Sequence, residues 1–463
     1  MRAHFHEIWQ RSRFFRIVLV LSVVYTVLRI MVQGGYLAMM LMPESGILGG
    51  VPEWAGAEGP MVPADLQIYI DAAEHIRARQ AIYLQGSLER LEDHYPYAPS
   101  FALAFTTFLW LSPPGIALVN TGLHFFAYLG MYVVWFRIFQ QWGFNKCERL
   151  MIWTLPVWLL FSSFWTDLGY LNIYIIVALV GSLFIRAVIS ENLPLAVLWL
   201  ALILQVKPHW AFALIVPLLL GRYRFFSKLL GLSVVAYLAI VAVVILIVGP
   251  EYGLQQHIEY VHFLGRLSDD FPWRTQSEGF IGYNHSIKQI VVYVLGLAPW
   301  SLFAATILKA LLLVPLALVA LRHLRRPLRE PGWQVPQRAL DLAFAFYLGA
   351  FIWLDMVWEL SLGVPLFVYL LGTLERRASR TLVMVSFLPY ALLDPWRVFS
   401  LVFLLLGWNV IAPGPYVLTD PAIYFPLIML SILVFYILLL RRLWTVPDLQ
   451  LRPGSWRAEV SEV

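Results

Sequence analysis

Long apolar runs separated by clusters of Arg and Lys are the feature that most limits what this chain can fold into. The first run, residues 14–33, follows Arg2, Arg11 and Arg13 and has Arg16 near its start. It lacks the short apolar core and small-residue cleavage site of a secretion signal. Four later basic clusters each open or close an apolar run, at residues 137–149, 222–228, 322–329 and 376–380. By the positive-inside rule these clusters mark cytoplasmic connections, and we expect a retained first helix with its N-terminus in the cytoplasm.

Composition excludes an ordinary soluble domain. Of the 463 residues, 60% are hydrophobic and only 13% are charged, whereas charged residues make up about 25% of a typical soluble domain. At roughly 20 residues per helical span plus connections, the chain has room for about eleven to thirteen crossings. We therefore predict an all-α polytopic membrane protein with about 11–13 transmembrane helices.

Cysteine and net charge exclude further classes. The single cysteine, Cys147, rules out an intrachain disulfide and a cysteine metal cluster. The net charge of +5 is too small and too scattered to indicate a nucleic acid partner. We expect no metal and no cofactor.

Acidic residues gather in two segments that this topology places outside the membrane. Nine of the 28 Asp and Glu residues fall within 34–97, and five more fall within 251–278. We therefore look for the functional site in two outer loops, 34–97 and 249–286. These loops belong to an expected transmembrane module, 1–321, which is followed by variable C-terminal transmembrane helices over 322–463.

Asp65 begins a segment whose apolar residues recur at the offsets of a helix lying on the membrane surface. Two interpretations are open. Asp65 could cap this helix and favour the positive end of its dipole. Alternatively, a carboxylate held at the lipid–water boundary could accept a proton from a substrate hydroxyl. Further along the same loop, His94 could assist such catalysis or simply be solvated.

Lys207 lies between two short apolar pieces, 193–206 and 210–220, which form a hairpin if both flanks are cytoplasmic. Lys207-Pro208 is then at the outer tip. A lysine in such a stretch is costly to insert and indicates a functional site that faces a cavity or an anion. The alternative is that it snorkels to the headgroups. For Lys309, in an unbroken Leu/Ala helix, snorkelling or a helix contact is the better interpretation.

Three basic residues of the second outer loop, Arg274, His285 and Lys288, are candidates for holding a phosphate, because cationic donors bind phosphoryl oxygens well. The alternative is a solvated loop of mixed charge. Asp167 and Glu359, at the outer ends of other helices, could line the same cavity or pair with nearby arginines.

Five stretches, taken in order, resemble glycosyltransferase family 87, the mannosyl- and arabinosyltransferase-like enzymes of the GT-C superfamily. They are Asp65-Leu-Gln-Ile-Tyr with Ala72-Ala73, Tyr95-Pro-Tyr-Ala-Pro99, Gly169-Tyr-Leu-Asn172, Lys207-Pro208 and Asn284-His-Ser286. The resemblance extends from the first helix to about Trp358. It implies a GT-C-like bundle with interfacial helices in the first outer loop.

The resemblance also implies an activity: an integral membrane glycosyltransferase of the plasma (inner) membrane with its active site on the extracytoplasmic face. Its partners would be a polyprenyl-phosphate donor of mannose or of a pentose such as arabinose, and a lipid or glycan acceptor. The reaction would be inverting and independent of metal. Asp65 matches the family's general base, and Lys207 matches its Lys-Pro position near the donor phosphate. Asn172, in the third stretch, would line the cavity.

Two stretches depart from the family pattern. The usual Gly-Gln-x-Asn is Gly169-Tyr-Leu-Asn172, and the late Trp-x-His-His is Trp358-Glu-Leu-Ser361. Without those histidines, either another basic residue holds the donor phosphate, or the donor differs, or the protein is inactive. Two other classes therefore stay open: a transporter or lipid flippase, and a non-catalytic partner in cell-envelope assembly. Against a transporter, no inverted pair of broken helices is evident, and the charge lies in outer loops.

Overall fold

The computed structural model describes residues 2–41, 62–83, 95–266, 271, 273–278, 281–325, 334–396, 399 and 426–445. Every regular element in these ranges is helical, and several are long and apolar. The predicted all-α polytopic class is therefore confirmed. His94 lies outside the described residues.

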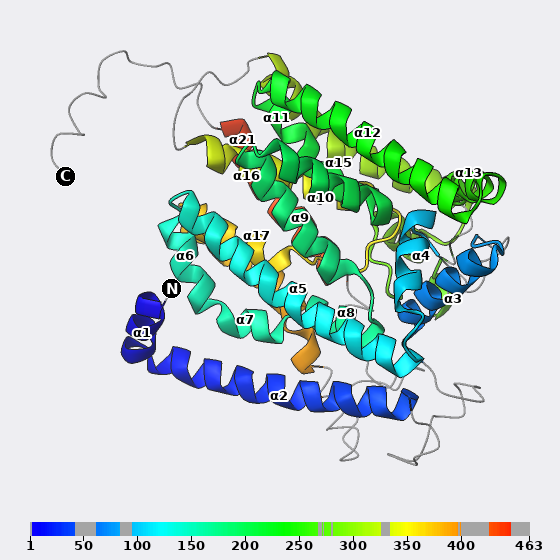
Figure 1. Cartoon of the computed structure of the whole chain (residues 1–463). Helices are drawn as coiled ribbons and strands as arrows, with labels where there is room; N and C mark the ends of the chain where they lie inside the picture. The colour runs from blue at the N-terminus through cyan, green and yellow to red at the C-terminus, as the bar shows by residue number, and fades with distance from the viewer. Residues whose placement is uncertain are drawn as a thin grey trace.

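Five helices are long and apolar enough to cross a bilayer. They are α2 (Arg13–Leu41), α5 (Pro113–Gln141), α12 (Tyr223–Val248), α15 (Pro299–Arg325) and α21 (Leu427–Thr445). Their outward side chains are apolar, as lipid contact requires; Leu246, for example, is 72% exposed. Arg29 of α2 pairs with Asp394 at 3.1 Å, which attaches this outlying helix to the bundle (Figure 1).

A sixth candidate span is broken. The helices α7 (Leu155–Leu160) and α8 (Ser162–Tyr170) are followed by α9 (Tyr174–Ile189) after a bend of 119°. Leu171, at the bend, has the left-handed φ of 52°. Shorter apolar helices complete the bundle, so the expected count of eleven to thirteen spans stays a prediction.

The predicted hairpin around Lys207 is present. The first arm is α10 (Leu193–Val206), and the return consists of the 3-10 helix η7 (Pro208–Ile215) and α11 (Val216–Leu219). The apolar run 287–321 is too long for one simple span, so its sequence predicts a break at Gly296–Pro299. The break is present, since α14 (Ile287–Leu295) ends before Gly296 and α15 begins at Pro299.

One end of the bundle carries the short helices of the outer loops. In Figure 1, α3 (Ala64–Ala78), α4 (Pro99–Phe105) and α13 (Pro250–Arg266) lie together at the end opposite the chain's N-terminus. The 3-10 turn η6 (Thr106–Phe108) extends α4, and η8 (Gln276–Glu278) precedes α14. α3 packs on α4, and α4 packs on α10, α12 and α13.

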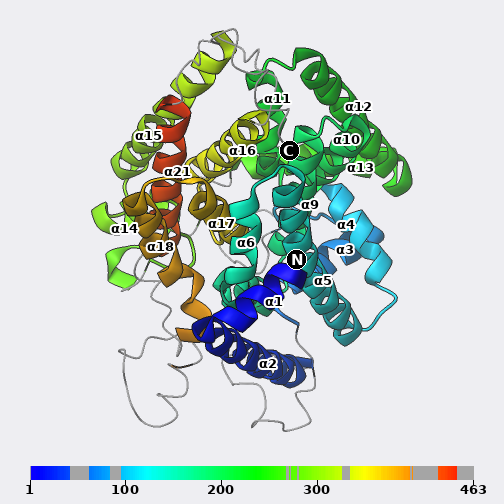
Figure 2. The same ribbon diagram turned by 90° about the vertical axis from the view of Figure 1, so that its left-hand side faces the viewer.

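The helices after residue 333 pack on one another and on earlier parts of the chain. α16 (Gln334–Trp353) contacts α15, α21 and η7, while α17 (Gly363–Thr373) lies on α6 (Asn145–Trp153) and α18 (Arg377–Ala391) on α21. At the other end, α1 (Arg2–Arg11) packs on α2 and α6. Figure 2 shows these helices from the N-terminal end, with α15 and α21 on one side and α12 on the other.

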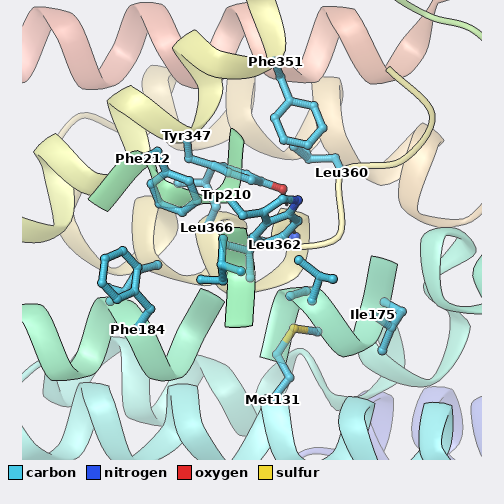
Figure 3. Close-up of a cluster of buried hydrophobic side chains, with 14 of the residues drawn as sticks. Met131, Ile175, Phe184, Trp210, Phe212, Tyr347, Phe351, Leu360, Leu362 and Leu366 are labelled. Atoms are coloured by element: carbon cyan, nitrogen blue, oxygen red, sulfur yellow. Dashed lines mark hydrogen bonds between the residues drawn. The ribbon is translucent and has the colours of Figure 1, made fainter. Parts of the chain in front are cut away.

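A buried apolar core joins distant parts of the chain. Figure 3 shows Trp210 of η7 beside Tyr347 of α16, with Leu362 and Leu366 below them and Met131 of α5 beneath. Trp210 and Tyr347 have ring centroids 5.4 Å apart. Helices from the predicted modules 1–321 and 322–463 therefore contribute to one core. The boundary between these modules at residue 321 stays a prediction.

Candidate functional site

Asp65 lies in the first turn of α3 and points toward the helix break after α8. The N-cap of α3 is Pro63 and no side chain caps the helix, so the capping interpretation of Asp65 is wrong, although its charge still favours the positive end of the helix dipole. Its Oδ2 accepts a 2.9 Å hydrogen bond from Nδ2 of Asn172. Two residues 107 positions apart, both candidates from the sequence, are thus in direct contact.

The side-chain amide of Asn172 is held in one orientation. Its Oδ1 accepts the backbone N–H of Ile173 at 2.7 Å, and the hydroxyls of Tyr69 and Tyr97 lie 3.3 and 3.5 Å from the same atom. Since Oδ1 receives donors, Nδ2 is the group left to donate to Asp65. Tyr69 and Tyr97 also share a 3.0 Å hydrogen bond, which fixes the rings.

Burial is the main influence on the Asp65 carboxylate. It raises the pKa of Asp65 from 3.8 to about 6; the Asn172 hydrogen bond lowers it, the charge of Asp167 raises it and that of Lys207 lowers it. A carboxyl with this pKa is mostly ionised at pH 7. It combines a basic form at neutral pH with a proton affinity well above that of a solvated aspartate, which suits a general base.

Lys207 ends α10 with its ammonium inside the protein. The residue is 8% exposed, and Nζ lies 3.9 Å from the ring centroid of Tyr174 and 5.0 Å from that of Tyr97. These are cation–π distances. Asp65 and Asp167 lie within electrostatic reach of the same ammonium. Lys207 is therefore part of the Asp65 cluster and does not extend toward the surface.

Asp167 binds backbone N–H groups at the break between α8 and α9. Its Oδ1 and Oδ2 accept the backbone N–H groups of Tyr174 and Ile175, at 3.3 and 2.9 Å, so it caps the start of α9. Its Oδ2 also lies 3.4 Å from Nε2 of His124, a buried residue of α5. The alternative prediction that Asp167 pairs with a nearby arginine is replaced by pairing with this histidine.

The second outer loop is attached to the segment that follows α16. Asn284 accepts the backbone N–H of Val357 at 3.0 Å and donates to the carbonyl of Asp355 at 2.8 Å, while the N–H of His285 donates to the carbonyl of Val357 at 2.8 Å. The side chain of Gln289 accepts the backbone N–H of Arg274 at 3.0 Å and donates to the carbonyl of the same residue at 2.8 Å. Arg274 and His285 are thus fixed by their backbones.

Lys288 and Lys309 share one carboxylate. Lys288 lies 3.2 Å from Oδ2 of Asp355, and Lys309 donates to Oδ1 of the same residue. Lys309 is 3% exposed, so the snorkelling interpretation was wrong and its alternative, a contact within the bundle, is the one observed. Lys288 therefore belongs to this second cluster, around Asp355.

Glu359 contacts Tyr390 and lies within electrostatic reach of the Asp65 cluster. Its Oε2 accepts a 2.5 Å hydrogen bond from the Tyr390 hydroxyl, and it acts electrostatically on Tyr174, as Asp65 and Asp167 do. The neighbouring Trp358 stacks on Tyr283 with centroids 6.4 Å apart. Glu359 therefore lies near the ring that contacts Lys207, and it directly precedes Leu360 and Ser361, where the family pattern has its two histidines.

Sequence reasoning missed His124 and the three tyrosines around Asp65 and Lys207. His124 had a usable signal, because an ionisable residue inside a transmembrane run indicates a functional site by default. Tyr69 and Tyr97 belong to stretches that resemble the family, but composition could not single out these residues or Tyr174, since aromatic residues are frequent in every part of this chain. Within the described ranges, no group of three or more His, Cys, Asp or Glu side chains could hold a metal ion.

Comparison with known proteins assigns the family. The sequence model of glycosyltransferase family 87 matches residues 95–346, more than half of the 463-residue chain. Searches of curated proteins and of solved structures returned no match. The matched segment contains Asn172 and Lys207, while Asp65 precedes it and Glu359 follows it. By the extent of this match, the chain belongs to glycosyltransferase family 87.

Proposed function

We propose that this membrane glycosyltransferase transfers mannose, or a pentose such as arabinose, from a polyprenyl-phosphate donor to a lipid or glycan acceptor. The reaction takes place on the outer face of the plasma membrane, with inversion at the anomeric carbon and without metal. The observation that carries the proposal is the contact of Asp65 with Asn172 beside the buried ammonium of Lys207, in a chain of family 87.

Asp65 is the proposed general base. The acceptor hydroxyl attacks the anomeric carbon and passes its proton to the carboxylate, while the bond from that carbon to the phosphate oxygen breaks. Attack from the face opposite the phosphate inverts the configuration. Asn172 holds one carboxylate oxygen, so the other is available to the incoming hydroxyl.

Lys207 is the proposed partner of the leaving phosphate. In the structure its ammonium faces aromatic rings, and no carboxylate of the described residues lies within 4.0 Å of it. A phosphate oxygen makes a stronger, charge-assisted hydrogen bond than a ring face does. Donor binding would therefore draw the ammonium from the rings, and its charge would stabilise the phosphate as negative charge develops on it.

Arg274, His285 and Lys288 are proposed as further phosphate contacts from the second outer loop. His285 and Lys288 are buried, and the backbone contacts of Asn284 fix this loop beside the Glu359 segment. They would take the place of the histidines that the Trp358–Ser361 stretch lacks. Asp167 and Glu359 would line the same region as acids that orient its hydrogen bonds.

The test is sugar transfer by purified protein in nanodiscs, with a panel of radiolabelled polyprenyl-phosphate sugars and membrane lipid extract as acceptor. Wild type and Asp65→Asn are compared with Asp71→Asn, whose carboxylate lies on the same helix and contacts Gln67 at 2.6 Å. We expect transfer by wild type and by the Asp71 variant, and none above background with Asp65→Asn.

The anomeric configuration of the product tests inversion independently of the base. Addition of a chelator should leave the rate unchanged. Wild-type protein that is folded but transfers no sugar from any donor would refute the proposed donor class. Full activity of Asp65→Asn would refute the assignment of the base while leaving the family's activity in place.

A further inference from the structure

We infer that His124 is a positioning residue: as an imidazolium paired with Asp167, it holds Asn172 against Asp65. This inference rests on the proposed function, because it gives His124 a role in aligning the proposed base. His124 lies in the middle of α5 and is 1% exposed. It touches no group that would react.

Both ring nitrogens of His124 face oxygen atoms. Nδ1 lies 2.7 Å from the carbonyl oxygen of Asn120, one turn earlier in the same helix. Nε2 lies close to the carbonyl oxygen of Asn172 and 3.4 Å from Oδ2 of Asp167. A carbonyl oxygen can only accept, so each nitrogen must carry a proton, and only the doubly protonated ring has two N–H groups.

The positive charge of the His124 ring is compensated by a neighbouring carboxylate. Asp167 is 2% exposed and, among the described residues, is the charged side chain that acts on His124. Asp65 contacts the side chain of Asn172, and Lys207 lies within electrostatic reach of Asp65 and Asp167. A buried charge is tolerated only when it is paired and hydrogen-bonded. The carboxylate and the imidazolium therefore stabilise each other inside the bundle.

The pair holds the chain at the helix break. Leu171 has φ 52°, a left-handed conformation that is unfavourable for a residue with a side chain, so the turn must be held by its surroundings. The Asn172 carbonyl is held by His124, and its N–H donates to the Asp167 carbonyl at 3.1 Å. His124 and Asp167 thus fix the backbone of Asn172, and this holds its side-chain Nδ2 in position to donate to Asp65.

The pair also influences the charge on the base. Asp167 disfavours ionisation of Asp65, whereas Lys207 favours it. An imidazolium next to Asp167 offsets part of its negative charge. Removing the ring's charge leaves Asp167 uncompensated, so the pKa of Asp65 should rise and the acid limb of the pH–rate profile should move to higher pH.

The experiment compares wild type with His124→Gln, His124→Gln/Asp167→Asn and a control, His323→Gln. His323 is also buried in a long apolar helix and its Nδ1 makes the same contact one turn back, 2.8 Å from the Val319 carbonyl, but at the far end of α15. We expect turnover of His124→Gln to fall about 10–100-fold, since small misplacements of catalytic groups have effects of this size. The acid limb of the pH–rate profile of His124→Gln should move to higher pH. The acid limb of the double variant should return to the wild-type position. The control should match wild type in both turnover and acid limb.

The protonation state is measured separately, in wild-type protein with 15N-labelled histidine in nanodiscs at pH 7.5. The signal absent from His124→Gln should show two protonated ring nitrogens. A neutral ring, or an unchanged acid limb in a folded His124→Gln, would overturn the inference. Failure of the proposed function would appear differently, as absence of transfer by folded wild-type protein, and failure of the proposed base as activity that survives Asp65→Asn. If His124→Gln does not fold, difference spectra against a folded His124→Asn assign the wild-type signal. The number of protonated ring nitrogens in that signal then decides whether the inference holds.

Discussion

Replacing Asp65 by Asn should make the protein more stable while it abolishes transfer. The ordinary pKa of the carboxyl is 3.8, and burial in the folded protein raises it to about 6. Each pKa unit corresponds to about 1.4 kcal/mol. Keeping Asp65 ionised at pH 7.5 therefore lowers the free energy of unfolding by about 3 kcal/mol. The neutral amide of Asn carries no charge to bury, so the Asn variant should not have this cost.

The sign of the pH dependence follows from the direction of the shift. The folded-state pKa lies above the unfolded one, so the folded protein binds this proton more tightly. The destabilisation by Asp65 is fully present above pH 6, shrinks between pH 6 and 3.8, and is absent below. The gain from Asn should thus be about 3 kcal/mol at pH 7.5 and about half of that at pH 5.

The assay is thermal unfolding in detergent, followed by tryptophan fluorescence at the two pH values, beside transfer measurements on the same samples. Asp71→Asn, on the same helix, is the control and should show neither the gain nor the loss of activity. Turnover of Asp65→Asn should fall at least about 10²–10⁴-fold, the usual contribution of a general base. An Asn variant no more stable than wild type at pH 7.5, or equally stabilised at pH 5, would refute the argument from burial.

Three further substitutions test the neighbouring residues. Lys207→Gln should lower turnover about 10²-fold, through loss of the proposed charge on the leaving phosphate, in steady-state kinetics at saturating donor. Asn172→Ala removes the hydrogen bond that lowers the pKa of Asp65, so the acid limb of its pH–rate profile should move above that of wild type. Gly181→Ala places a Cβ 2.7 Å from an indole carbon and should cost about 1–3 kcal/mol in thermal unfolding, whereas Gly231→Ala, with nothing within 4 Å, should be neutral.

The sequence predicted those features that depend on local patterns. The break at Gly296–Pro299 and the hairpin tip at Lys207-Pro208 follow from proline chemistry and hydropathy, and both are present. Asp65, Asn172 and Lys207 were each singled out, but their contact was not predicted, because it depends on how α3, α8 and α10 pack. Only the fold brings together residues 107 positions apart.

The sequence left two interpretations of Lys309 open, snorkelling and a helix contact, for the same reason. Snorkelling is a reasonable interpretation of a lysine in an apolar helix when its neighbours in space are unknown. The structure supplies Asp355 from another helix end, and in a low-dielectric interior a paired charge is more stable than an isolated one. No pattern within α15 could have shown that partner.

The helix breaks explain why the candidate site lies where it does. Inside a membrane, each backbone group freed by a break must find a partner within the protein. At the break between α8 and α9, the partners are side chains of the site: Asp167 takes the N–H groups of Tyr174 and Ile175, and Asn172 takes that of Ile173. The interactions that make the break tolerable thus also aim Asn172 at Asp65. Substitutions at the break should therefore change stability and the pH dependence of transfer together, whereas Asp65→Asn should separate the two.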